Sequence, residues 1–179
     1  YRECTAVIYF LSDNHADEFL GDLQDFHPVD KKNNLLILLG DTCLKLASAP
    51  KYENFSRWLL SRDYPIAIVD GNHENYAYLN QAREEEWMGG TVNRLAKNVV
   101  HLKRGELYQI QGHSFFVFGG CDSSAGWKAK GLWHEGDLPS SAELEQAYKN
   151  LKKANYQVDY ILTHKYFCNQ CFVCEGQPE

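Results

Sequence analysis

The sequence has no hydrophobic run long enough to cross a membrane, since a spanning helix needs roughly 18 or more consecutive apolar residues. The apolar run Leu35–Leu39 has only the length of a strand. Positive charge is also scarce, with 18 Lys and Arg against 24 Asp and Glu and a formal net charge of -6. Proteins that bind the nucleic-acid backbone usually carry a basic excess or stripe. We therefore expect no membrane partner and no unspecific nucleic-acid binding.

The chain lacks internal repeats, low-complexity stretches and linker-like segments, so we expect one domain over residues 1–179. Its six cysteines are not spread like a disulfide scaffold, because three of them crowd into Cys168, Cys171 and Cys174. That spacing resembles part of a zinc knuckle without a fourth ligand nearby, and free thiols are the preferred interpretation. Together with the lack of a secretory-signal pattern, the cysteines predict a reducing, cytoplasmic location.

What the chain does have is enough apolar residues for a core, at 44% hydrophobic and 13% aromatic over 179 residues. A chain of this length hides roughly 70% of its unfolded surface, so any metal it holds should serve chemistry rather than folding. Apolar periodicity and capping signals predict an α/β fold whose second half is a meander. Strands are expected over 5–11, 35–39, 66–69, 99–102, 106–110, 114–118 and 158–162, and helices over 16–26, 54–62, 76–86 and after Ser140.

Polar residues follow four of the predicted strands, at the edge where ligands bind in α/β sheets. They are Asp13 and His15, Asp41, Asn72 and His73, and His164. Carboxylate, imidazole and amide groups without thiolate suit a catalytic site for Mn, Fe, Zn, Co or Ni. Glycine at positions 40 and 71 fits as well, because backbone packed beside a metal cluster has no room for a β-carbon.

The ordered set resembles the motifs of the calcineurin-like metallophosphoesterase superfamily, from about residue 5 to about residue 165. The matching motifs are Asp13-x-His15, Gly40-Asp41, Gly71-Asn72-His73-Glu74 and Thr163-His164, and the loop and helix after Gly119-Gly120 are similar to small bacterial members. The resemblance implies an α/β sandwich of two β-sheets flanked by helices.

The resemblance also implies two divalent metal ions, with Mn or Fe favoured and Zn, Ni or Co compatible. It assigns Asp13 and His15 to one ion, Asp41 as the bridge, and Asn72 and His164 to the other. His73 and Asp41 would be catalytic, His73 by contacting the phosphate and stabilising or protonating the leaving oxygen. The implied activity is hydrolysis of a small phosphorylated substrate, a phosphomonoester or phosphodiester, by a metal-activated hydroxide. The sequence leaves the oligomeric state open.

Two departures from the family pattern matter. The closing Gly-His-x-His does not follow His164, and Gly112-His113 precedes the fourth motif and is interpreted as unrelated. Either the motif lies beyond the given chain, or the centre is incomplete and the protein is a catalytically degenerate binding or interaction protein; a redox or zinc-dependent cysteine tail is a third interpretation. Leu44 stands where Ser/Thr protein phosphatases carry a carboxylate that orients the histidine equivalent to His73, which argues against that subtype.

The loop over residues 121–138 combines tryptophans and cations with His134, which is a candidate for binding the organic part of a substrate. The alternative is a surface loop packed on the core. Asp70 and Glu74 are candidates for supporting the metal ligands, against the alternative of solvated loop acids. The acidic run 84–86 is interpreted as a solvated helix face.

Overall fold

The computed structural model describes residues 6–16, 25–46, 50–129 and 134–165. Its strands form two sheets. The first has six strands in the order β1-β2-β3-β6-β5-β4. The strands β1, β2, β3 and β6 are parallel to one another, β5 is antiparallel to β6, and β4 is antiparallel to β5. Their bounds are β1 Ile8–Leu11, β2 Leu35–Leu39, β3 Ile66–Val69, β4 Arg83–Trp87, β5 Gly90–Ala96 and β6 Val99–Leu102.

The second sheet has three strands in the order β7-β8-β9, with β7 antiparallel and β9 parallel to β8. These strands are β7 Leu107–Ile110, β8 His113–Val117 and β9 Tyr160–Leu162. The helices are α2 Pro50–Leu60, α3 Tyr76–Gln81, α4 Ala125–Ala129 and α5 Ser141–Lys153, with a 3-10 turn η1 at Glu135–Asp137.

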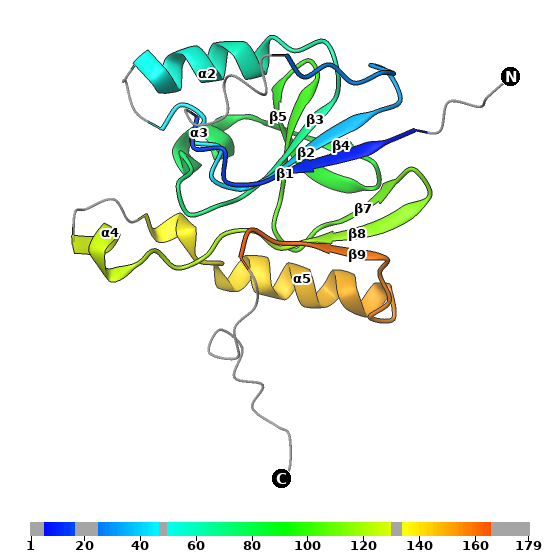
Figure 1. Ribbon diagram of the computed structural model, residues 1–179. Coiled ribbons are helices and arrows are strands. Elements are labelled where there is room, and N and C mark those ends of the chain that lie inside the picture. Colours follow the sequence, from blue (N-terminus) through cyan, green and yellow to red (C-terminus); the bar gives the residue numbers. More distant parts are fainter. Residues whose placement is uncertain (1–5, 17–24, 47–49, 130–133, 166–179) are drawn as a thin grey trace, which may run out of the picture.

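The molecule is layered, with the two sheets stacked face to face between α2 and α5 (Figure 1). Side-chain alternation along β2 shows why. Leu36 and Leu38 pack toward α2, whereas Leu35 and Ile37 point into the apolar layer between the sheets. A strand that is buried on both faces must be apolar throughout, as β2 and β3 are. The predicted α/β sandwich is confirmed.

The outer layer on the second sheet is α5. Ser140 and Glu143 form the predicted capping box, in which Ser140 Oγ accepts from the Glu143 backbone N–H. The apolar stripe of α5, with Ala147 buried, packs on Phe116 of β8 and on Phe118, which directly follows that strand.

The helix predicted over 76–86 is wrong in its second half. The helix α3 ends at Gln81, and the acidic run Glu84 to Glu86 lies on strand β4 rather than on a helix face. β4 forms a hairpin with β5, a strand that the sequence analysis did not predict. The hairpin is stabilised by an ion pair between Glu85 and Arg94 at 2.5 Å.

The expectation of a meander holds only for β7 and β8. The strand β6 belongs to the first sheet, where it pairs parallel to β3, and β9 pairs parallel to β8. The helix predicted over 54–62 runs from Pro50 to Leu60. Most of the helix predicted over 16–26 lies outside the described residues. No helix in the described ranges is long and apolar enough to span a bilayer.

Candidate metal centre

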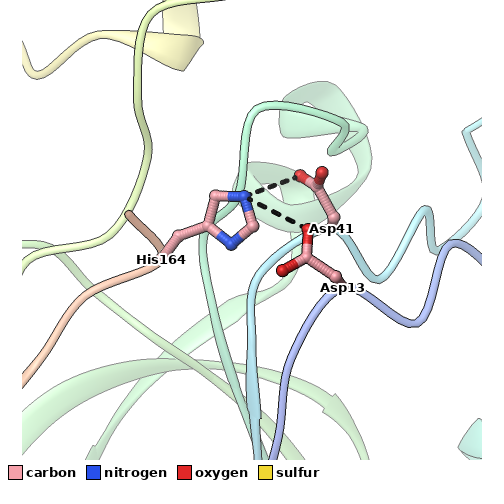
Figure 2. Close-up of side chains that lie close together, drawn as sticks. All are labelled: Asp13, Asp41 and His164. Carbon is pink, nitrogen blue, oxygen red and sulfur yellow. Dashed lines mark ion pairs between the residues drawn. The ribbon is translucent and has the colours of Figure 1, made fainter. Parts of the chain in front are cut away.

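The segments that follow β1, β2, β3 and β9 converge at one place. Asp13, Asp41 and His164 each offer a ligand atom there, and these atoms lie within 4.8 Å of one another (Figure 2). His15 joins them, with its Nε2 3.5 Å from Asp41 Oδ2 and 3.8 Å from Asp13 Oδ1. Four residues predicted from the strand ends are therefore brought together.

The backbone at this place is packed too closely for side chains at two glycines. A β-carbon on Gly40 would lie 2.3 Å from His164 Nδ1, and one on Gly71 would lie 2.1 Å from the backbone nitrogen of Asp41. Asp13, His15 and Asp41 themselves adopt positive φ angles of 45 to 55°. Non-glycine residues rarely hold such angles; those that do lie in turns and at ligand sites, and Asp and His are among the residue types that adopt them more often.

His164 is held in the orientation of a metal ligand. Its Nδ1 is 2.8 Å from the backbone oxygen of Leu39, and because a carbonyl only accepts, Nδ1 carries the proton. Its Nε2 then has a lone pair when the ring is neutral. This atom is buried, has no hydrogen-bond partner among the described residues, and lies 3.4 Å from Asp41 Oδ1 and 4.0 Å from Asp13 Oδ1.

A buried lone pair facing two carboxylates is unfavourable unless a positive charge lies between them, so the residues present fit a divalent cation. When no metal ion is bound, a proton on Nε2 of His164 can supply this positive charge. Burial, the largest influence, lowers the pKa of His164, but the contacts with Asp41 and Leu39 and the charge of Asp13 outweigh it and raise the pKa. Burial, the largest influence, raises the pKa of Asp41, but the hydrogen bond and charge of His164 and the contacts with His73 outweigh it and hold that pKa below its usual value.

Asp41 also organises the loop after β3. Its Oδ1 accepts hydrogen bonds from the backbone N–H groups of Asn72 and His73, both at 2.9 Å. The side chain is almost fully buried. One carboxylate thus orders the Gly-Asn-His-Glu loop and faces three imidazoles, those of His15, His73 and His164.

His73 stands beside this cluster. Its Nε2 is 3.9 Å from Asp41 Oδ2, and its ring centroid is 5.5 Å from that of His15. Burial lowers the pKa of His73, Asp41 opposes this and the charge of His15 adds to it. The lowered pKa favours the neutral ring, which carries one N–H. Leu44 is buried in the core beneath α2, so it takes no part in orienting His73.

His134 lies outside the group of Asp13, Asp41 and His164. It is exposed, caps η1 by accepting from Gly136 N–H through Nδ1, and stacks on Tyr76 with ring centroids 5.6 Å apart. Its predicted contact with substrate stays a prediction. The three C-terminal cysteines and Trp133 lie outside the described residues. His113 begins β8, opposite the end from which the Gly119-Gly120 turn leaves that strand, and its ring contacts Tyr160.

Asp70 and Glu74 are buried rather than solvated. Glu74 accepts from the backbone N–H groups of Thr42 and Gly71 and bonds the Thr42 hydroxyl at 2.6 Å. Asp70 contacts His101 Nε2 at 2.6 Å and Arg104 Nε at 3.0 Å. Both acids therefore support the loops that carry the candidate ligands, as the sequence analysis allowed.

A group of buried polar residues around the loop after β3 was not predicted from the sequence. Arg104 Nη2 donates to the Tyr76 hydroxyl, and this hydroxyl donates to the Gly71 oxygen at 2.6 Å. The Asn72 side chain forms hydrogen bonds with Cys121 and Ser123, which follow β8. Nothing in the spacing of these residues distinguishes them from ordinary loop residues, so only the fold reveals them.

A model of the calcineurin-like phosphoesterase family matches residues 6–167. The chain therefore belongs to this family, as its motifs predicted, and members generally bind two divalent metals. No curated protein and no solved structure matches the chain at a significant level.

Proposed function

We propose that this protein is a binuclear metal-dependent phosphoesterase that hydrolyses a small phosphomonoester or phosphodiester. The observation that carries the proposal is the buried Nε2 of His164, which has no hydrogen-bond partner among the described residues and faces Asp41 and Asp13. An apolar or hydrogen-bonded group would serve a binding scaffold equally well at this position. An imidazole lone pair beside two carboxylates is what a cation site needs.

The donor set supports Mn or Fe, with Zn, Ni or Co also compatible, because it combines carboxylate, imidazole and amide groups. Asp13 and His15 would hold one ion, Asn72 and His164 the other, and Asp41 both. When bound, two such cations supply Lewis-acid activation of water and positive charge against the phosphoryl oxygens. The other residues of the site would contribute by positioning the metal ligands and the substrate.

His73 suits the role of a hydrogen-bond donor to the substrate. Its side chain is 12% exposed and lies beside Asp41 and His15, next to the candidate metal ligands. A neutral imidazole donates one N–H to a phosphoryl or leaving oxygen without attracting that oxygen away from the cations. Such a donor or general acid typically contributes about 10²- to 10⁴-fold to a rate.

The test is hydrolysis of para-nitrophenyl phosphate and its bis ester by the native-length protein loaded with Mn²⁺, with metal content measured on the same sample. We expect about two ions per chain and metal-dependent turnover. Asp41→Asn should lose both bound metal and turnover. His73→Ala should keep its metal and lose about 10²- to 10⁴-fold in kcat. His113→Ala, which removes an exposed imidazole on β8, is the matched control and should change neither quantity.

Two results would overturn the proposal. A native-length protein that binds no metal would show that the motifs are retained as part of the fold and do not form a metal site. A protein that binds two ions but hydrolyses neither ester would favour the alternative, a degenerate member of the family that binds a ligand or partner without turnover.

A further inference from the structure

A buried chain of hydrogen bonds runs from Asn72 to the turn before α5. Asn72 Nδ2 donates to Ser123 Oγ at 3.2 Å, and Ser123 Oγ donates to Asp137 Oδ2 at 2.9 Å. The three residues are 6%, 3% and 1% exposed. They come from three separate segments, which follow β3, follow β8 and form η1. Burial of this kind is costly for a carboxylate unless its partners are well placed.

The direction of this chain is set at its far end. Asp137 Oδ2 also receives the backbone N–H of His134 at 3.3 Å, so this oxygen acts as an acceptor. The single hydroxyl proton of Ser123 is therefore committed to Asp137. Ser123 has only lone pairs left for Asn72, which must present its NH₂ group and not its oxygen.

The other side of the amide agrees with this orientation. The Cys121 thiol donates to Asn72 Oδ1 at 2.9 Å, so the oxygen lies on the side away from Ser123. A divalent cation binds the amide oxygen and is repelled by the NH₂ group. An Asn72 side chain that could rotate by 180° and exchange its oxygen with its NH₂ group would be a metal ligand in only one of the two orientations.

Asp137 is itself held in place from both sides. Arg104 Nη2 donates to the Gly136 oxygen at 2.7 Å and Nη1 donates to the Leu138 oxygen at 3.0 Å. The Arg104 side chain is 2% exposed and pairs with Asp70, the residue at the end of β3. The turn that carries Asp137 is thus fixed relative to the end of β3, where the loop that carries Asn72 begins.

We propose that Asp137, acting through Ser123, is a positioning residue that fixes the amide of Asn72 so that its oxygen offers a metal ion the lone pair that the Cys121 thiol does not use. The inference rests on the proposed function, because it needs Asn72 to be a ligand. It assigns no contact between Asp137 or Ser123 and the substrate. Loss of either residue should weaken the ion held by Asn72 and leave the other ion in place.

The test is a calorimetric Mn²⁺ titration of the metal-free, native-length protein and its variants. Ser123→Ala should weaken one of the two sites about 10- to 100-fold, the usual effect of removing a group that orients a metal ligand. Asp137→Ala should do the same. In the double variant Asp137→Ala should add nothing further, because its effect passes through Ser123.

The matched control is Ser140→Ala. It also removes a serine hydroxyl near the turn, and its hydroxyl contacts only Glu143 among the described residues. This variant should bind Mn²⁺ as the wild type does, although it loses stability. Thermal unfolding of the metal-free variants separates a loss of fold from a loss of metal affinity. If Asp137→Ala does not fold, the Mn²⁺ affinity of Ser123→Ala alone tests the inference, because this substitution removes only one oxygen atom.

Wild-type affinity at both sites in Ser123→Ala would overturn the inference while leaving the proposed function intact. Additive losses in the double variant would overturn the route from Asp137 through Ser123. A wild-type protein that binds no Mn²⁺ would overturn the proposed function, and this inference with it.

Discussion

Gly40 leaves the space that the His164 imidazole occupies. A β-carbon at position 40 would lie 2.3 Å from Nδ1 of His164, and the residue has a φ of +87°. We therefore expect Gly40→Ala to displace the imidazole and to weaken Mn²⁺ binding at least tenfold, as measured by titration calorimetry. Gly112→Ala is the control, because Gly112 has nearly the same φ, +82°, with nothing within 4 Å of the added carbon. It should cost about 1 kcal/mol of backbone strain and leave Mn²⁺ affinity unchanged; equal losses in both variants would contradict the steric argument.

Glu74 should make the stability of the metal-free protein depend on pH. Burial raises its pKa to about 8, although its hydrogen bonds to Thr42 oppose this. Between the usual glutamate pKa of 4.5 and about 8, the folded chain holds a proton on Glu74 that the unfolded chain releases. The stability contributed by the protonated carboxyl is complete below that range and is lost as pH rises through it, at up to about 1.4 kcal/mol per pH unit.

The comparison that isolates Glu74 is Glu74→Gln, whose amide oxygen can accept from Thr42 and Gly71 as Glu74 does and whose NH₂ can face the Thr42 hydroxyl. Urea unfolding from pH 5 to 9 should show a steeper fall for the wild type than for the variant. Parallel curves would mean that Glu74 is ionised throughout, held so by its three donors.

The sequence was sufficient to predict Asp13, His15 and Asp41 as neighbours, because the ends of parallel strands meet at one sheet edge. His164 was predicted beside them, but it follows a strand of the second sheet, so the shared edge does not explain its place. Ser123 and Asp137 could not be predicted. Their link to Asn72 depends on how the loop after β8 folds over the loop after β3, and an acid or serine in a loop is common without any such role.

At the scale of single elements, the capping of α5 offers the clearest test. Ser140 accepts the Glu143 N–H, and Glu143 bonds back to the Ser140 backbone. Ser140→Ala should lower the free energy of unfolding by about 1 kcal/mol in urea, the usual cost of losing such a cap. An unchanged midpoint would mean that packing of α5 on the second sheet alone holds the helix end.

The same element shows what sequence patterns can specify. Both the cap and the apolar stripe of α5 are local, so the sequence predicted the helix correctly. The hairpin of β4 and β5 depends instead on pairing between strands. Three consecutive glutamates carry no apolar alternation, and β4 exists because β5 pairs with it along Arg83–Trp87. Local propensity was overridden there by a neighbouring strand.

At the scale of the whole molecule, the candidate centre joins both sheets. Asp13 and Asp41 follow strands of the first sheet, whereas His164 follows β9 of the second. Figure 2 shows His164 entering from a different segment than the two carboxylates it faces. A cation bound there would connect the layers, in addition to the apolar residues between the sheets and hydrogen bonds such as that between His164 and the Leu39 oxygen.

This arrangement predicts that metal binding stabilises the entire fold. An ion at a hundredfold excess over its Kd stabilises a protein by about 2.7 kcal/mol, if it binds only the folded state. For a chain of this size each kcal/mol raises Tm by about 2–4 °C, so one site should give about 5–11 °C. Differential scanning calorimetry with Mn²⁺ and with a chelator measures this shift. Asp41→Asn should abolish it, since Asp41 faces every imidazole of the centre. If Asp41→Asn kept the full shift in Tm, the ion would be bound elsewhere, at exposed carboxylates. The close approach of His164 to Asp13 and Asp41 would then be explained by a protonated His164 and not by a metal ion.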